Sequence, residues 1–286
     1  MGKHKKVGKY QNWDKEEDSS AVRAKKHLGQ HFLKDQVVAR KIAETLLLNG
    51  YDNVIEIGPG TGVLTQYLLE QDINILALDL DRESIEYLKT DFEINHLKLL
   101  QRKKSFEVRN ADFLKEDLST LFNGAPFGIT GNFPYNISTQ IVFKMLEYKD
   151  RVPEFTGMFQ KEVAERIIAK PGTKAYGRLG ILAQWKSTPS VVMELPPEAF
   201  TPPPKVHSAV VHLEALAQPR FPAPAGLLSS TVAMAFNQRR KMLRSSLKSA
   251  APDIETALRD AGLEPTARAE EISLEGFCAL ARRLAK

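Results

Sequence analysis

The sequence contains only one cysteine, Cys278, among 286 residues, so an intramolecular disulfide is excluded. No apolar run approaches the roughly 20 residues that a membrane-spanning helix needs. The lysine-containing N-terminus is not followed by an apolar segment, and we therefore expect no secretory signal. These absences predict a cytoplasmic protein with no membrane partner. We also expect no bound metal.

What the sequence has in excess is positive charge. Its net charge is +5 and its isoelectric point is about 9.1, which favours an anionic partner but does not identify one. Residues 1–24 hold a lysine cluster and an acidic patch with little apolar periodicity, so we predict a disordered tail. A solvated terminus is the simpler interpretation of this tail, and contact with RNA phosphates is the alternative.

A glycine-rich segment, Glu-Ile-Gly-Pro-Gly-Thr-Gly at residues 56–62, follows the apolar run 53–57 and precedes a helix-like run. This order predicts a strand, a tight turn and a helix N-terminus, where a ligand can approach the backbone closely. A second apolar run, 73–79, ends in Asp79, whose carboxylate is placed to bind ribose hydroxyls. The dinucleotide fingerprint GxGxxG needs a third glycine where Val63 stands, so the GxGxG spacing favours S-adenosyl-L-methionine over a dinucleotide.

The sequence Asn-Phe-Pro-Tyr at residues 132–135 lies between a short apolar run, 127–131, and a helix-like run. Alone it is ordinary turn chemistry, but here we expect it at the carboxyl end of a parallel strand, where open α/β sheets bind ligands. An adenine amine is a poor nucleophile because its lone pair is delocalised into the ring. The Asn132 side-chain oxygen and the next backbone carbonyl can accept its two hydrogens, Pro134 fixes the turn, and Tyr135 can stack on the base. The turn therefore predicts an adenine-N-methyltransferase that needs no strong base.

Strand-like and helical segments alternate over residues 25–213, which predicts an α/β, Rossmann-like methyltransferase domain with a doubly wound sheet. A further apolar run, 106–110, is predicted as its third strand. Proline-rich residues 218–224 interrupt regular structure and predict a linker. Helix-like periodicity then predicts a small all-helical domain, residues 214–286, with helices near 227–236, 239–250, 254–261 and 274–284.

Further motifs occur in order along the chain, namely Gly-Gln-His-Phe-Leu at 29–33, Asn-Ala-Asp at 110–112, Lys-Ala-Tyr-Gly-Arg-Leu at 174–179, a proline-rich motif at 199–211 and Ala-Phe-Asn-Gln-Arg-Arg-Lys at 235–241. Together with the motifs above, they make the sequence from Lys25 onward resemble the ribosomal small-subunit RNA adenine dimethyltransferases, which are class I methyltransferases. The resemblance implies N6,N6-dimethylation of two adjacent adenosines in a hairpin near the 3′ end of 16S ribosomal RNA. It also implies S-adenosyl-L-methionine as the donor, a role in small-subunit biogenesis, the immature 30S subunit as the partner and a monomeric protein.

The resemblance also implies roles for individual residues. Asp112 would accept a hydrogen bond from the donor's adenine, and a helix N-cap is its alternative role. Phe200 would close over the target adenine opposite Tyr135, whereas a core position is the ordinary place for phenylalanine. The implied donor-site residues are Gln30, His31, Leu33, Glu56, Gly58, Gly60, Asp79, Asp112 and Asn132, and the implied catalytic residues are Asn132, Pro134, Tyr135 and Phe200.

Three positions depart from the family pattern, which usually has Asn, Leu and Glu where this chain has His31, Phe133 and Asp79. The shorter acid can still reach ribose, and we expect Phe133 to contribute mainly its backbone. His31 either contacts the donor or packs beside it.

Cations alternate with apolar positions around residues 238–244, as on a helix with one packed face. A solvated helical face is the ordinary interpretation of such a pattern, and the resemblance favours RNA contact. The predicted RNA-binding residues are Arg239, Arg240, Lys241 and Arg244.

Three other functions fit parts of the sequence. The large-subunit RNA adenine dimethyltransferases that confer macrolide resistance are related enzymes, but the 199–211 motif and the basic helical region favour the small-subunit branch. A ribosome assembly factor whose catalysis is secondary would use the same surface. A nicotinamide-dependent reductase is disfavoured by the GxGxG spacing and by the Asn-x-Pro-Tyr turn.

Residue usage changes along the chain. Residues 1–150 contain 16 Lys and 5 Arg, whereas residues 214–286 contain 3 Lys and 8 Arg alongside 15 Ala. This reversal resembles two genomes with different nucleotide biases, and a chimeric chain is therefore a hypothesis. A single natural gene that encodes the whole chain would contradict it.

Overall fold

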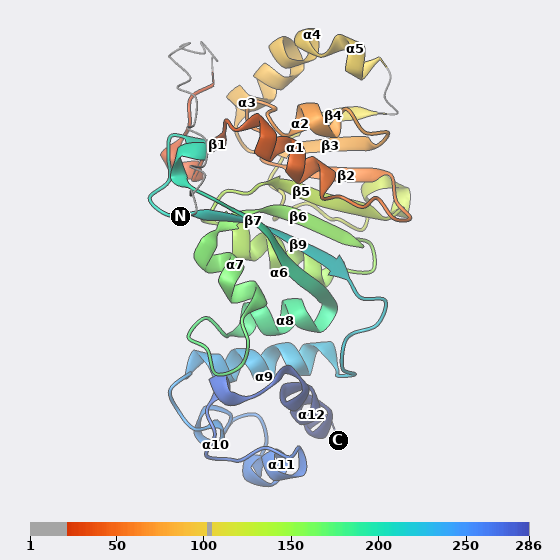
Figure 1. The fold of residues 1–286 in the computed structure, drawn as a ribbon. Helices are drawn as coiled ribbons and strands as arrows, with labels where there is room; N and C mark the ends of the chain where they lie inside the picture. The colour runs from red at the N-terminus through yellow and green to blue at the C-terminus, as the bar shows by residue number, and fades with distance from the viewer. Residues whose placement is uncertain (1–21, 102–104, 286) are drawn as a thin grey trace, which may run out of the picture.

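The structure, a computed structural model, describes residues 22–101 and 105–285 (Figure 1). Most of the predicted tail, residues 1–21, lies outside the described residues. The centre is a seven-stranded sheet in the spatial order β4 (Phe106–Asn110), β3 (Asn74–Asp79), β2 (Asn53–Ile57), β5 (Phe127–Asn132), β6 (Glu154–Gln160), β9 (Ser208–Ala215) and β7 (Ser187–Leu195). Neighbouring strands are parallel from β4 to β6, and β9 is antiparallel to β6 and β7. The four strands predicted from apolar runs agree with the structure to within one residue.

Helices cover both faces of the sheet, because successive side chains of a strand point to opposite sides. In β2 and β3, Val54 and Ile75 belong to one apolar cluster, and their neighbours Ile55 and Leu76 belong to the other. The first cluster includes buried residues of α1 (Gln36–Glu44), α2 (Thr65–Leu68) and α3 (Arg82–Tyr87), and the second includes those of α6 (Ser138–Glu147), α7 (Lys161–Ile168) and α8 (Arg178–Lys186). Helices therefore lie on both sides of the sheet, which confirms the predicted α/β Rossmann-like class.

Two segments far apart in the sequence meet in a small second sheet. Its strands, β1 (Phe32–Leu33) and β8 (Phe200–Thr201), pair antiparallel with Leu33 opposite Phe200. The main-chain amide of Lys34 also donates to the carbonyl of Ala199 at 3.0 Å. The pairing holds the chain that precedes α1 against the segment that leads into β9.

Short helical elements complete the chain between the longer ones. They are η1 (Lys26–Leu28), η2 (Leu88–Phe92), α4 (Glu93–Asn95), α5 (Leu97–Leu100), η3 (Leu121–Gly124), η4 (Pro197–Ala199) and η5 (Ala269–Glu271). Within the described ranges, no helix combines the length and the apolar composition that crossing a bilayer requires.

The C-terminal helices are α9 (Ala225–Asn237), α10 (Leu243–Ser246), α11 (Ile254–Asp260) and α12 (Leu274–Leu284), and α9 lies beside α8 (Figure 1). Their buried residues, including Leu228, Phe277 and the lone Cys278, belong to the same apolar cluster as those of α6, α7 and α8. The preceding linker is anchored as well, because the indole nitrogen of Trp185 donates to the carbonyl of Phe221 at 2.7 Å. The apolar core is therefore continuous, and the predicted domain boundary at residue 214 stays a prediction.

The predicted helix at 239–250 is wrong over most of its length. Residues 238–241 form a turn, and only Leu243–Ser246 are α-helical. The reason is that the amides of Leu243 and Arg244 donate to the carbonyls of Ala267 (2.8 Å) and Pro265 (3.0 Å) instead of to the preceding turn. Met242, which has extended backbone angles, pairs with Arg268 in an isolated antiparallel bridge. A neighbouring segment thus replaces the helical hydrogen bonds that the periodicity predicted.

Candidate active site

A pocket opens where the carboxyl ends of β2, β3, β4 and β5 meet, the edge at which open α/β sheets bind ligands. Nine of the predicted site residues line it, namely Gln30, His31, Gly58, Gly60, Asp79, Asp112, Asn132, Pro134 and Tyr135. They come from segments spread over more than a hundred residues of sequence, and the parallel strands bring them together. The structure does not bring Leu33, Glu56 or Phe200 to the pocket wall.

The turn after β2 needs glycine for two separate reasons. Gly58 and Gly60 have φ angles of 68° and 56°, in the left-handed region that side chains disfavour. In addition, a Cβ atom at Gly60 would lie 2.8 Å from the ring of Phe32. The turn therefore presents bare backbone to the pocket, which Gln30 and His31 also line.

Asp79 at the end of β3 is mostly buried and holds the glycine turn in place. Its Oδ2 accepts a hydrogen bond from the amide of Gly60 (3.3 Å), and its Oδ1 accepts one from the amide of Asp81 (2.8 Å). Burial raises the pKa of Asp79, although these amide hydrogen bonds oppose the shift. A carboxylate offers about four acceptor positions, so each oxygen keeps capacity for a ligand hydroxyl.

Sequence analysis missed the apolar walls of the pocket. Leu80 lines it next to Asp79 and is 49% exposed, and Ala111 lines it beside Asp112. The position directly after a carboxylate at a strand end was the available signal for Leu80. Asp112 lines the pocket, and its Oδ1 accepts a hydrogen bond from the amide of Leu114 (3.0 Å), while its contact with the donor stays a prediction. The segment that it caps is a turn and not a helix.

The amide group of Asn132 is oriented by the main chain of another segment. Its Nδ2 donates to the carbonyl of His31 at 2.7 Å, which leaves Oδ1 as the free acceptor of the side chain. Two glycines leave the space that residues 131–133 need next to β2 and β6. A Cβ at Gly131 would lie 2.3 Å from the carbonyl oxygen of Ile57, and one at Gly157 would lie 1.9 Å from the ring of Phe133.

Phe133 is buried in the core, where its ring stacks on Phe155 with centroids 5.1 Å apart. The missing Cβ at Gly157 provides the space for this ring. Phe133 thus anchors the turn from beneath, and only its backbone is available to accept a hydrogen bond at the expected place.

Tyr135 is held on two sides. Its ring stacks against that of His31, with centroids 5.4 Å apart and an interplanar angle of 28°. Its hydroxyl lies 2.5 Å from the hydroxyl of Ser208 at the start of β9, and burial raises the pKa of Tyr135. The imidazole ring of His31 is fixed as well, because its Nδ1 lies 2.7 Å from the carbonyl oxygen of Pro202. His31 therefore joins the turn to the 199–211 motif.

The three predicted residues that do not line the pocket are buried behind it. Phe200 is 1% exposed, and it shares the apolar cluster with Leu33, its partner in the β1–β8 pair. Glu56 is also 1% exposed, and its Oε2 accepts a hydrogen bond from the hydroxyl of Thr65 at 2.7 Å. Burial and the nearby Asp79 carboxylate raise the pKa of Glu56 to about 8, which favours the neutral form of this side chain. Direct contact of Leu33 and Glu56 with the donor, and of Phe200 with the target adenine, stays a prediction.

The predicted RNA-binding cations differ in what they contact. Arg239 is engaged within the fold, because its guanidinium donates to Glu270 Oε2 (2.7 Å) and to the carbonyls of Lys174 (2.8 Å) and Thr173 (3.0 Å). Arg240 and Lys241 are exposed, and no carboxylate within residues 22–101 and 105–285 pairs with either. Arg244 is exposed and lies 3.7 Å from Glu255. Arg239 thus ties two loops together, while the cations that follow it face solvent.

Comparison with known proteins gives a consistent result. The profile of the family described as ribosomal RNA adenine dimethylase matches residues 21–286. The ribosomal RNA small subunit methyltransferase A of Cereibacter sphaeroides is 53% identical over 266 residues, which cover 92% of both chains. The protein of the same name from Flavobacterium johnsoniae is 45% identical and covers 92% of this chain and 96% of its own.

Two solved structures are similar over most of the chain. A dimethyladenosine transferase from Plasmodium falciparum has a TM-score of 0.72 and 25% identity, covering 87% of this chain and 96% of its own. The 23S rRNA methyltransferase ErmE has a TM-score of 0.66 and 28% identity, covering 89% of this chain and 100% of its own.

Proposed function

This chain belongs to the ribosomal RNA adenine dimethylase family, and we propose that it dimethylates the N6 amines of two adjacent adenosines in small-subunit ribosomal RNA, using S-adenosyl-L-methionine. The observation that carries the proposal is that one pocket is lined both by the Gly58 turn with Asp79 and by the turn that contains Asn132 and Tyr135. A donor site and a base-binding site therefore share a wall. This adjacency is what a direct methyl transfer between two bound molecules requires.

The residues of the pocket fit the donor. The carboxylates of Asp79 and Asp112 suit ribose hydroxyls and an adenine amine, and the side chain of Leu80 offers an apolar wall for the adenine ring. The bare backbone at Gly58 and Gly60 admits the remainder of the molecule closely. When bound there, S-adenosyl-L-methionine supplies an electrophilic methyl group.

The chain's own residues supply geometry to the target amine. Asn132 Oδ1 and the carbonyl of Phe133 accept the two amine hydrogens, which turns the nitrogen lone pair out of conjugation with the ring. Tyr135, held by His31 and by Ser208, stacks on the base. With a donor methyl group in line with this lone pair, the nitrogen would form its bond to the methyl carbon as the carbon–sulfur bond breaks, and the amine proton would leave to solvent. These contacts favour the transition state over the flat ground state of the amine.

We propose the 16S RNA of an immature 30S subunit as the substrate, near the 3′ end, with the protein acting in the cytoplasm as a monomer. The small-subunit names of relatives at 45% and 53% identity support this choice over large-subunit RNA. The exposed Arg240 and Lys241 support docking on RNA phosphates. Large-subunit RNA is the competing substrate, because the similar ErmE is named for 23S RNA.

One experiment tests the substrate and the reaction together. The protein is incubated with isotope-labelled S-adenosyl-L-methionine and with undermethylated 30S particles, mature 30S particles or large-subunit RNA, and nucleosides are then analysed by mass spectrometry. We expect labelled dimethyladenosine from undermethylated 30S particles alone. Labelling of large-subunit RNA instead would contradict the proposed substrate. Tight binding to immature particles without any methylation would favour an assembly factor.

A further inference from the structure

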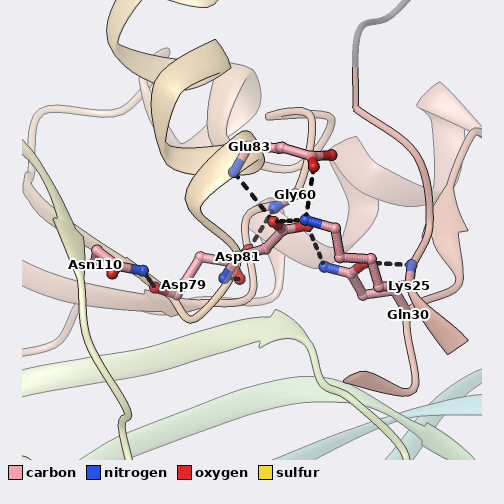
Figure 2. A network of polar contacts seen from close by, with 7 residues as sticks. All are labelled: Lys25, Gln30, Gly60, Asp79, Asp81, Glu83 and Asn110. Carbon is pink, nitrogen blue, oxygen red and sulfur yellow. Dashed lines mark hydrogen bonds and ion pairs between the residues drawn. The ribbon is translucent and has the colours of Figure 1, made fainter. Parts of the chain in front are cut away.

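The chain that covers the pocket forms a distinct structural unit, residues 25–33, which we call the arm. Gln30, His31 and Phe32 of the arm line the pocket together with Gly58 and Gly60. The arm is anchored at its end by the β1–β8 pair and at its middle by the hydrogen bond from Asn132 to the carbonyl of His31. Its beginning is anchored separately, by the polar network shown in Figure 2.

The centre of this network is Asp81, whose side chain is 0% exposed. Its Oδ1 lies 2.5 Å from the ammonium nitrogen of Lys25, and its Oδ2 accepts a hydrogen bond from the side-chain amide of Gln30 at 3.1 Å (Figure 2). Oδ1 also accepts from the main-chain amide of Glu83 at 3.1 Å, which caps α3. One buried carboxylate thus contacts both the start and the middle of the arm.

Both polar atoms of the Gln30 side chain take part in this network. Its Nε2 donates to Asp81, and its Oε1 accepts from the main-chain amide of Lys25 at 2.7 Å. Gln30 was predicted to bind the donor, but both polar atoms of its side chain are used to close the arm on itself and onto Asp81. Gln30 lines the pocket, and its contact with the donor stays a prediction.

Asp81 is also joined to the acid at the end of β3. Its main-chain amide donates to Asp79 Oδ1, while Asp79 Oδ2 accepts from the amide of Gly60 (Figure 2). The turn that orients the ribose-binding carboxylate is thus the turn that holds the arm. Burial raises the pKa of Asp81, but hydrogen bonds from Lys25, Gln30 and Glu83 outweigh it, so its pKa lies below the usual value and the group is charged at neutral pH.

We propose that Asp81 is a positioning residue for the methyl donor, which it does not touch, because it holds the arm over the pocket through Lys25 and Gln30. This inference rests on the proposed donor site. A carboxylate that accepts a charged and a neutral hydrogen bond from the same segment fixes that segment more firmly than neutral contacts do. Without this anchor the start of the arm keeps only the contact of Lys25 with the exposed Glu83 among its ion pairs within the described residues, and a donor must order this part before binding.

The test compares two single substitutions that remove a carboxylate charge next to Lys25. Asp81→Asn keeps the α3 cap, because asparagine caps helices as well as aspartate does, but it loses the ion pair and presents an amide NH2 to Gln30. Glu83→Gln is the matched control, because Glu83 lies 3.1 Å from the same ammonium group and is exposed. S-adenosylhomocysteine affinity is measured by calorimetry, and hydrogen exchange is followed over residues 25–33.

We expect Asp81→Asn to weaken S-adenosylhomocysteine binding about tenfold or more and to speed exchange in the arm, while Glu83→Gln changes affinity by less than about twofold. In steady-state methylation, the donor KM of Asp81→Asn should rise with a much smaller change in kcat.

The outcomes separate the two levels of the proposal. Parental affinity in folded Asp81→Asn protein, or unchanged exchange in the arm, would overturn the role of Asp81 and leave the donor site standing. Equal losses in Asp81→Asn and Glu83→Gln would assign the effect to general charge near the pocket, which also contradicts the positioning role. A parent protein that binds no S-adenosylhomocysteine would overturn the proposed function itself.

Discussion

Asn132 donates its side-chain amide to the main-chain carbonyl of His31, at a nitrogen–oxygen distance of 2.7 Å. This bond decides which way the amide group faces, and it leaves Oδ1 as the acceptor on the pocket side. Because His31 also stacks on Tyr135, one arm residue orients both polar and aromatic parts of the turn. His31, at a position where the family usually has asparagine, thus serves packing and orientation.

The first prediction concerns this oriented amide. Asn132→Ala removes an acceptor for the target amine, and loss of a well-placed polar group in a dry site lowers the chemical step by about a hundredfold or more. Single-turnover methylation of undermethylated particles at saturating donor measures this step. A folded variant that methylates at the parental rate would show that Asn132 is not required for the geometry of the amine.

The second prediction separates the ring of Tyr135 from its hydroxyl. Tyr135→Phe should keep most of the activity, because stacking on the base survives without the hydroxyl, whereas Tyr135→Ala should lose most of it. Ser208→Ala, which removes only the partner at 2.5 Å, should behave like Tyr135→Phe. Equal rates for the Phe and Ala variants in the same single-turnover assay would rule out stacking as the role of the ring.

The third prediction distinguishes a structural arginine from phosphate-binding cations. Replacing Arg240 and Lys241 with glutamine should weaken binding to 30S particles and lower the slope of log affinity against log salt by about two, because each phosphate contact contributes about one. Arg239→Gln should leave that slope unchanged. It should instead lower the free energy of unfolding by about 1–2 kcal/mol, because its three acceptors are left unpaired.

Filter binding over a salt series and chemical denaturation measure these two effects. If Arg239→Gln lowers the salt slope as much as one of the exposed cations does, then Arg239 contacts RNA despite its partners in the fold. If the slope of the Arg240 and Lys241 double variant is parental, the turn at 238–241 is only a solvated surface.

The fourth prediction follows from the buried carboxyl of Glu56. Its folded pKa is about 8, well above the ordinary 4.5, so the stability that its proton contributes is present below about pH 4.5 and is lost as the pH rises to about 8. Glu56→Gln mimics the protonated form and should remove this loss. The stability advantage of the variant should grow from pH 5 to pH 8, at up to about 1.4 kcal/mol per pH unit.

Urea denaturation of both proteins at several pH values measures the advantage. Thr65→Val, which removes the hydrogen bond to Glu56, serves as a control for polar packing at the same site. A constant difference between Glu56→Gln and the parent across this pH range would mean that Glu56 is not protonated in the folded protein.

Four strands and the two pocket motifs were predictable, because the conformation of each is set by residues that are close together in the sequence. The apolar runs that end at Ile57 and Asp79 predicted buried parallel strands, and the glycine spacing between them predicted a tight turn with open backbone. Periodicity predicted a helix at 239–250 that the structure does not have, because the amides of Leu243 and Arg244 bond to residues 265–267, which no local pattern reveals.

The sequence by itself determined four strands of the sheet, the glycine turn, the carboxylate of Asp79 and the Asn-x-Pro-Tyr turn, since all are properties of short segments. Only the tertiary structure decided which side chains face the pocket and which are already engaged. Gln30 and Arg239 belong to the predicted site, but in the fold Gln30 donates a hydrogen bond to Asp81 and Arg239 donates one to Glu270. Whether a polar group is free for a ligand depends on partners far away in the chain, 51 and 31 residues in these two cases, and such partners meet only when the chain is folded.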